Sequence, residues 1–154
     1  SEKTDADCNR KKAEKEETDT HRLKGLRFLC AEDNELNAEI LKELLHMEGA
    51  DCVICPNGRS VVDTFEQSVP GDYDMILMDV QMPVMNGYEA TKAIRKGKHP
   101  LARTIPIIAM TANAFSEDVQ KSLSAGMNAH ISKPMDMKKL ARVVKKERIK
   151  FGLK

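Results

Sequence analysis

From residue 23 onward, short apolar runs alternate with segments in which apolar residues recur every three or four positions. Each run ends in a polar residue or a turn signal, which is typical of a strand. We expect five strands, at residues 26–31, 51–55, 75–78, 105–110 and 129–132. The third run is apolar throughout, as expected of a strand that is buried on both faces of a sheet.

Segments with helical spacing follow each of these runs. The first segment contains the set Leu36, Ile40, Leu41, Leu44 and Leu45. Asn86 and Glu89 have the spacing of a capping box, which predicts a third helix from about Tyr88. Gly49 and Gly126 end the first and fourth segments. The last helix carries its apolar face on Met137, Leu140, Val143 and Val144.

Five strands that alternate with five helices, joined by short connections, predict a parallel sheet with helices on both faces. Right-handed crossovers leave few possible strand orders for such a sheet. We expect the flavodoxin-like (βα)5 fold, an α/β fold whose five parallel strands have the order 2-1-3-4-5. In sheets of this kind, ligands bind beyond the carboxyl ends of the strands, near the point where the strand order reverses.

Residues 1–22 differ in composition from the rest of the chain. Thirteen of these 22 residues are charged, and only Ala6, Cys8 and Ala13 are apolar. Such a segment cannot bury enough apolar surface to offset the entropy that it would lose on ordering. We expect residues 1–22 to be a charged, disordered tail or linker, with a short solvated helix as the alternative, and residues 23–150 to form one domain.

The overall composition, with 41% apolar and 32% charged residues, is that of a globular domain. Because no apolar run exceeds four residues, we expect no transmembrane helix, no signal peptide and no membrane contact. The net charge of +1 argues against binding of nucleic acid by charge alone. Residues 135–154 nevertheless hold 8 basic and 2 acidic residues, so the last helix is either a docking face or an ordinary solvated face.

Four cysteines in a chain of 154 residues do not resemble the disulfide framework of a secreted protein, which favours a cytoplasmic location. Cys52 and Cys55 form a C-x-x-C pattern on the second predicted strand. Since an offset of three residues places two side chains on opposite faces of a strand, we expect neither a redox pair nor half of a zinc site here.

Chemically reactive side chains follow four of the predicted strands. Glu32 and Asp33 come after the first, Asp79 after the third, Thr111 after the fourth and Lys133 after the fifth. The first and third strands are neighbours in the predicted order, so three carboxylates converge on one edge of the sheet. Mg²⁺, a hard cation with oxygen ligands, would relieve their mutual repulsion. With a hydroxyl and an ammonium beside it, such a site suits phosphoryl transfer with Asp79 as the nucleophile.

Four short motifs occur at these strand ends, in order along the chain. They are Ala-Glu-Asp-Asn at 31–34, Met-Asp-Val-Gln-Met-Pro at 78–83 leading to Asn-Gly at 86–87, Thr-Ala-Asn at 111–113, and Lys-Pro at 133–134. The combination resembles the receiver domain of response regulators in two-component signalling, over about residues 26–148. The charged segment before it and the Thr-Ala-Asn-Ala-Phe run at 111–115 are similar to receivers at the end of hybrid sensor histidine kinases.

This resemblance implies how the site would take up a phosphoryl group. Asp79 would be the phospho-acceptor, and Thr111 and Lys133 would hold the phosphoryl group. The donor would be the phosphohistidine of a histidine kinase or of a histidine phosphotransfer domain. Gln81 and Asn113 lie where they would tune the lifetime of the phosphorylated state by hindering or orienting water.

The resemblance also implies a metal site and a switch. Glu32, Asp33, Asp79 and the backbone carbonyl of Gln81 would hold Mg²⁺, Asp33 directly and Glu32 through water. In receivers an aromatic side chain three residues before the lysine follows the threonine inward on phosphorylation. Here that position is His130, which is either a pH-sensitive switch side chain or a half-buried, hydrogen-bonded histidine.

An aspartate-nucleophile phosphatase of the haloacid-dehalogenase kind is the alternative function. That chemistry needs a second aspartate two residues after the nucleophile as a general acid, and Gln81 occupies this position. We expect no independent enzyme activity beyond Mg-dependent autophosphorylation and autodephosphorylation, although the parent protein could be a histidine kinase. The domain would act in the cytoplasm, either free or tethered to a membrane-bound sensor kinase.

Overall fold

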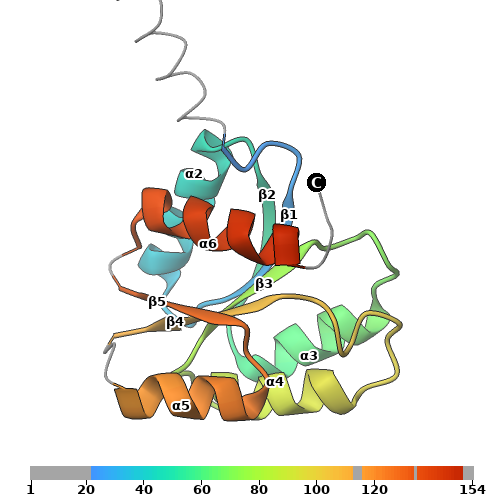
Figure 1. The fold of residues 1–154 in the computed structure, drawn as a ribbon. Coiled ribbons are helices and arrows are strands. Elements are labelled where there is room, and N and C mark those ends of the chain that lie inside the picture. The colour runs from blue at the N-terminus through green and yellow to red at the C-terminus, as the bar shows by residue number, and fades with distance from the viewer. Residues whose placement is uncertain (1–21, 113–115, 134, 151–154) are drawn as a thin grey trace, which may run out of the picture.

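The computed structural model describes residues 22–112, 116–133 and 135–150 and places them around a five-stranded parallel sheet. The strand order is β2-β1-β3-β4-β5 (Figure 1), as the sequence predicts. The strands are β1 (Arg27–Ala31), β2 (Asp51–Cys55), β3 (Met75–Asp79), β4 (Ile107–Thr111) and β5 (Ala129–Ser132). The helices are α2 (Glu35–Met47), α3 (Gly58–Gln67), α4 (Gly87–Lys96), α5 (Ser116–Ala125) and α6 (Met137–Lys150).

Helices cover both faces of the sheet, with α2 and α6 on one face and α3, α4 and α5 on the other (Figure 1). Each face has its own apolar core. Phe28 packs with Leu41 of α2 and Leu140 of α6, whereas Leu29 packs with residues of α3 and α4 such as Phe65. Phe28 and Leu29 are neighbours in β1 and are both fully buried. Their opposite orientations follow from the alternation of side chains along a strand.

The fourth strand departs from its predicted bounds. β4 begins at Ile107 rather than at residue 105, and it includes Thr111. Pro106 has no N–H to donate to the sheet, although its carbonyl accepts a hydrogen bond from the Ile76 N–H (2.9 Å). Thr111 lies opposite Ser132 in the register of β4 with β5. The backbone of Thr111 is therefore fixed by the sheet rather than by a loop.

The predicted capping box at the start of α4 is present. The Asn86 side chain accepts a hydrogen bond from the Glu89 N–H (2.9 Å), and the Glu89 carboxylate accepts one from the Asn86 N–H (3.4 Å). A second capping box joins Asn57 and Ser60 at the start of α3. The first box fixes the end of the loop that leaves β3, and this loop borders the predicted site.

Cys52 and Cys55 point to opposite faces of β2, as predicted from their spacing. Cys52 packs against the core under α2 and α6, whereas Cys55 belongs to the core on the α3 side. Both thiols are free, and so is the buried thiol of Cys30.

The described part of the chain is well packed from its first residues. Leu23 is 1% exposed, and the Arg22 guanidinium contacts the Glu48 carboxylate at 3.1 Å. Apart from Arg22, the predicted tail lies outside the described residues. None of the described helices has the length and apolar character that crossing a lipid bilayer would require.

Candidate functional site

The candidate site lies at the edge of the sheet where the carboxyl ends of β1, β3, β4 and β5 meet. A cavity of about 340 Å³ opens there. Its lining includes Glu32 and Asp33 after β1, Asp79 at the end of β3, Thr111 at the end of β4 and Lys133 after β5. The structure thus brings together the five side chains that the sequence places at strand ends.

The loop between β3 and α4 folds back over the end of β3. The Gly87 N–H donates to the Val80 carbonyl (3.0 Å), which brings the start of α4 against the strand. A Cβ atom at position 87 would lie 3.0 Å from the Val80 Cα and closer still to the Asp79 carbonyl oxygen. Glycine is therefore required for this close approach, which holds the backbone of Asp79 at the wall of the cavity.

Lys133 connects two carboxylates that come from different strands. Its Nζ atom donates to Asp79 Oδ2 at 2.8 Å and to the Glu32 carboxylate oxygens at 3.1 and 3.3 Å. The Glu32 and Asp79 side chains are only 3% and 7% exposed. Although burial favours the neutral amine, the hydrogen bonds to Asp79 and Glu32 raise the pKa of Lys133. The ammonium is therefore the counter-charge that lets these carboxylates be buried together.

Glu32 remains electrostatically strained despite this contact. Burial, and next the adjacent Asp79 carboxyl group, raise the pKa of Glu32 from 4.5 to about 7, against the opposing effect of Lys133. A single ammonium cannot compensate two carboxylates fully. In the metal-free protein Glu32 therefore keeps its proton at pH values where an isolated glutamate would already have lost it.

Replacing Glu32 with Gln should stabilise the metal-free protein at alkaline pH. A group with a raised folded-state pKa gives stability that is present at low pH and is lost as the pH rises from 4.5 toward about 7. That shift costs at most about 3 kcal/mol above neutrality. Because the new amide also has to be hydrogen-bonded, we expect Glu32→Gln to gain about 1 kcal/mol near pH 8 and nothing near pH 5.

Urea denaturation in the presence of a chelator, near pH 5 and near pH 8, measures this difference. Glu39→Gln is the matched control, because Glu39 is exposed on α2 and should change stability little at either pH. A variant Glu32→Gln that is less stable than the parent at the higher pH would show that Glu32 is not under electrostatic strain.

Asp33 completes a cluster of carboxylates that could hold a metal ion. One oxygen from each of Glu32, Asp33 and Asp79 lies within 4.8 Å of the other two. Asp33 is exposed, whereas the other two are buried. Gln81 lies beside them, since its N–H donates to Asp79 Oδ1 at 3.2 Å. Oxygen donors of this kind suit a hard divalent cation such as Mg²⁺, and the Gln81 carbonyl as a ligand stays a prediction.

Thr111 and Lys133 are tied together through the backbone. The Lys133 N–H donates to the Thr111 carbonyl at 2.8 Å, which continues the β4–β5 pairing beyond β5. Thr111 is 6% exposed and lines the same cavity as Lys133. A hydroxyl and an ammonium thus reach one cavity from neighbouring strands. Asn113, the other residue predicted here, lies outside the described residues.

His130 lies on β5, three residues before Lys133, and is half-buried opposite Ala109 in the register of β4 with β5. Its predicted part in a switch stays a prediction. Two features of the site were missed by sequence reasoning. The sequence assigns Asn86 to a capping box and the Asn-Gly pair at 86–87 to a motif, but it does not indicate the close approach over β3 for which Gly87 is required. Nothing in the sequence indicated that Lys133 contacts both Glu32 and Asp79.

Comparison with known proteins places this site in a family. The response regulator receiver domain matches residues 28–145 of the chain. Hybrid signal transduction histidine kinase I of Dictyostelium discoideum is 39% identical over 127 residues, which cover 81% of this chain. Because the match covers 7% of that relative, the chain corresponds to a small part of its length.

Solved structures show the same fold. The receiver domain of sensor histidine kinase PA1611 from Pseudomonas aeruginosa, which has a magnesium ion coordinated in its active-site cleft, is 36% identical with a TM-score of 0.70. That match covers 79% of this chain and 96% of the other. A second match is a chain from the co-crystal structure of the Saccharomyces cerevisiae histidine phosphotransfer protein Ypd1 and the receiver domain of Ssk1. It is 28% identical with a TM-score of 0.68, and the match covers 79% of this chain and 88% of the other.

These matches give no support to the phosphatase alternative. The site agrees with that result, because Gln81 stands where the phosphatase chemistry needs an aspartate. The cavity instead combines clustered carboxylates, a hydroxyl and an ammonium at the carboxyl edge of a five-stranded sheet. The chain belongs to the response regulator receiver domains, the phosphoacceptor modules of two-component phosphorelays.

Proposed function

We propose that Asp79 accepts a phosphoryl group from the phosphohistidine of a histidine kinase or a histidine phosphotransfer domain. A carboxylate oxygen of Asp79 forms the new P–O bond while the N–P bond of the phosphohistidine breaks. The other nitrogen of the phosphohistidine ring carries a proton, so the electron pair of the broken bond leaves on a neutral imidazole. The observation that carries this proposal is the position of Asp79. It is 5% exposed, lines the cavity, and lies 2.8 Å from the Lys133 ammonium.

Lys133 and Thr111 are the residues that hold the transferred group. An incoming phosphoryl group brings negative charge into a cavity that already contains three carboxylates. Lys133 can keep its contact with Asp79 while it exchanges Glu32 for a phosphoryl oxygen. The Thr111 hydroxyl can donate to a second oxygen from the adjacent strand. Both donors are placed before the reaction begins, which lowers the cost of reorganisation.

The acidic cluster fits Mg²⁺ by the chemistry of its donors. Glu32, Asp33, Asp79 and the Gln81 carbonyl would hold the ion, Asp33 directly and Glu32 through water. The raised pKa of Glu32 supports this fit, because it reports a deficit of positive charge at the place where a cation would bind. When bound, the ion supplies positive charge that neutralises the carboxylates and stabilises the phosphoryl oxygens.

We assign two further roles in the phosphorylated state. Gln81 and Asn113 would set its lifetime, and His130 would take part in the change that a partner recognises. Gln81 is exposed beside Asp79, where its side chain can block or orient an attacking water molecule. We assign the same role to Asn113. His130 would follow Thr111 when the threonine moves toward the phosphoryl group, since β4 and β5 are paired and His130 lies opposite Ala109, two residues before Thr111.

We infer that the chain is the receiver portion of a hybrid histidine kinase, with residues 23–150 as the domain and residues 1–22 as a linker. The similarity to a hybrid kinase of Dictyostelium discoideum supports this origin. Kinase activity would then belong to other parts of the parent protein, and this chain would contribute only its own phosphorylation and dephosphorylation. The domain would work in the cytoplasm, free or tethered through its parent.

Incubation with Mg²⁺ and a small acyl phosphate, followed by intact mass spectrometry, tests the proposed function. We expect one phosphoryl group per chain, no adduct in the presence of a chelator, and loss of the adduct on treatment with hydroxylamine. Hydroxylamine cleaves acyl phosphates but leaves phosphate esters of serine and threonine intact. Absence of an adduct, or an adduct that survives hydroxylamine, would overturn the assignment of an aspartyl phosphate.

A further inference from the structure

Two cysteine side chains lie together on neighbouring strands, in the core under α2 and α6. Cys30 of β1 and Cys52 of β2 belong to this same core, and a hydrogen bond joins their thiols. Cys52 lies opposite Phe28 in the register of β1 with β2, so the two cysteines are diagonal neighbours on one face of the sheet. Cys55 points to the other face. The thiol pair is therefore created by the pairing of strands and not by the C-x-x-C spacing.

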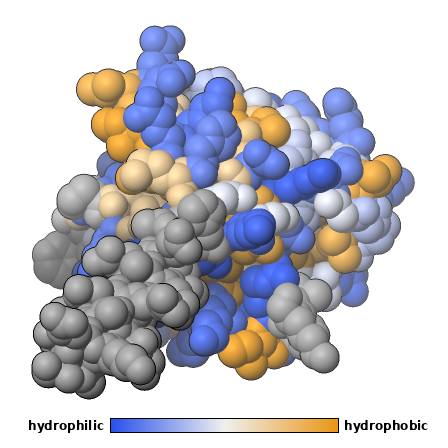
Figure 2. Space-filling model, turned by 90° about the horizontal axis from the view of Figure 1, so that it is seen from above, coloured by the Kyte–Doolittle hydropathy of each residue, from blue (hydrophilic) through white to orange (hydrophobic). Residues whose placement is uncertain are grey.

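The two thiols differ in their access to solvent. Cys30 is fully buried, whereas Cys52 is half-buried and lines a cavity of about 420 Å³ between α2 and β2. Lys42 is exposed on α2 and lines the same cavity. Figure 2 views the molecule from the side of α2 and α6 and shows hydrophilic residues over much of this surface. A small polar molecule can therefore reach Cys52 from solvent without unfolding of the core, past a positive charge.

Cys52 has the properties of a thiol that ionises readily. The hydrogen bond with Cys30 and the positive charge of Lys42 lower the pKa of Cys52, against the opposing effect of burial. Burial and the hydrogen bond to Cys52 raise the pKa of Cys30 well above its usual value. The thiolate is the nucleophilic form of cysteine, and reactive cysteines occupy partly exposed, positively charged surroundings. Cys52 is therefore the attacking thiol of the pair, and Cys30 lies within reach of its product.

We propose that Cys52 and Cys30 are a redox pair that hydrogen peroxide converts to a disulfide between β2 and β1. The Cys52 thiolate attacks one oxygen of the peroxide, so that an S–O bond forms, the O–O bond breaks and hydroxide leaves. The sulfur is oxidised by two electrons, and the peroxide is reduced. The Cys30 sulfur then attacks the Cys52 sulfenic acid. An S–S bond replaces the S–O bond, and the Cys30 proton leaves with the hydroxide as water.

The position of β2 in the sheet allows this bond to close. Diagonal neighbours on adjacent strands of a flat sheet have Cα atoms about 8 Å apart, whereas the Cα atoms of a disulfide are about 4.4 to 6.8 Å apart. β2 must therefore shift along β1. In the described part of the chain β2 is an edge strand that pairs with β1 alone, so the shift breaks no second set of strand pairs. A disulfide closed under strain is easily reduced, which suits a reversible switch.

A shift of β2 along β1 would reach the phosphoacceptor site. Cys30 lies two residues before Glu32, and the Glu32 N–H donates to the Cys55 carbonyl of β2 at 3.0 Å. Moving β2 therefore displaces the backbone that carries Glu32 and Asp33, which both belong to the acidic cluster. A misplacement of about 1 Å in a reactive site can cost up to about 10²-fold in rate. On the basis of the proposed function, we expect the disulfide to slow phosphoryl uptake at Asp79 by about tenfold.

Mild treatment of the full chain with hydrogen peroxide, followed by alkylation and mass spectrometry, tests the proposal. We expect the intact mass to fall by two hydrogen atoms, and dithiothreitol to reverse the change. Trypsin places Cys30 in the peptide 28–42 and Cys52 in the peptide 43–59, so the disulfide should link these two peptides. Cys55→Ser is the matched control, because Cys55 shares a peptide with Cys52 and should not be needed for the link.

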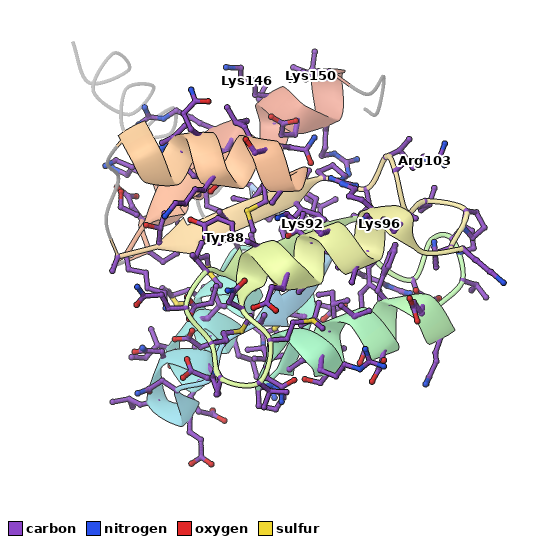
Figure 3. The ribbon with its side chains drawn as sticks, turned by 90° about the horizontal axis from the view of Figure 1, so that it is seen from below. Tyr88, Lys92, Lys96, Arg103, Lys146 and Lys150 are labelled. Atoms are coloured by element: carbon purple, nitrogen blue, oxygen red, sulfur yellow. The ribbon has the colours of Figure 1, made fainter. Side chains whose placement is uncertain are left out.

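Further variants separate the roles of the two thiols. Cys30→Ala should form no disulfide and should accumulate Cys52 sulfenic acid, which dimedone labels. Cys52→Ala should leave Cys30 unoxidised, because Cys30 is fully buried. Lys42→Met should slow the oxidation by about two- to fivefold. Lys92→Met, on α4 in the opposite layer (Figure 3), should leave the rate unchanged. All variants should keep the circular dichroism of the parent.

Phosphoryl uptake with Mg²⁺ and a small acyl phosphate is measured on the reduced protein first and on the oxidised protein second. We expect slower uptake after oxidation and full recovery with dithiothreitol. A disulfide in a protein whose reduced form takes up no phosphoryl group would support the redox pair and overturn the proposed function. Absence of a disulfide, a disulfide that involves Cys8 or Cys55, or equal uptake by the oxidised and reduced protein would overturn the inference.

Discussion

Replacing Asp79 with Asn should abolish the phosphoryl adduct that forms with Mg²⁺ and a small acyl phosphate. An amide oxygen is a far weaker nucleophile than a carboxylate, and the amide also removes one oxygen from the acidic cluster. Asp79 Oδ2 is moreover the atom that lies 2.8 Å from the Lys133 ammonium. We expect the initial rate of adduct formation to fall by at least about 10³-fold, measured by intact mass over time.

Asp63→Asn is the matched control for this experiment. Asp63 lies on α3 with a side chain that is 47% exposed, and it pairs with Arg59 at 3.5 Å. The control loses one carboxylate from the same chain but none from the cavity, so its adduct should match that of the parent. Asp79→Asn should also keep its thermal stability, because Lys133 retains Glu32 as a partner. A normal adduct in Asp79→Asn would show that another residue is the acceptor.

The order of strands and helices could be predicted from the sequence because each element carries a local signal. Runs such as residues 75–78 are apolar throughout, and the Asn86–Glu89 capping box marks where α4 begins. The first strand begins one residue later than predicted, at Arg27, and the largest error occurred where one residue has a special backbone property. Pro106 cannot donate a hydrogen bond to the sheet, so β4 starts one residue after it rather than one before.

The composition of the candidate site was also predictable, since parallel strands bring their carboxyl ends to one edge. The contacts inside the site were not. Lys133 is 54 residues from Asp79 and 101 residues from Glu32 along the chain, and both contacts depend on the pairing of strands between them. The pKa of Glu32 follows from these same contacts and from burial, neither of which has a local signal.

α2 shows a further limit of pattern reasoning. Five apolar residues at helical spacing predicted the helix correctly, but they do not all point into the core. Leu41 and Leu45 are buried, whereas Leu36 and Ile40 are exposed by 69% and 48%. A helix that has more apolar residues than its buried side can hold presents the surplus to solvent, and a partner can then bury it.

Replacing Lys133 with Met should slow phosphoryl uptake by about 10² to 10³-fold while leaving Asp79 in place. Methionine has a similar length and no charge, so the change removes the ammonium and keeps much of the packing. Two effects add to the loss. No cation then meets the phosphoryl oxygens from this side, and the pKa of Glu32 rises further because Lys133 no longer lowers it. Initial rates at saturating Mg²⁺ measure the defect, with Lys139→Met on α6 as the control.

The pH dependence of the remaining activity separates these two effects. If the proton held by Glu32 limits the reaction, Lys133→Met should regain part of its rate as the pH rises, because Glu32 then ionises. If the missing contact with the phosphoryl group limits it, the defect should be the same at every pH. We expect a defect that shrinks with rising pH and does not vanish, since Lys133 serves both purposes. A rate equal to that of the parent at neutral pH would remove Lys133 from the proposed mechanism.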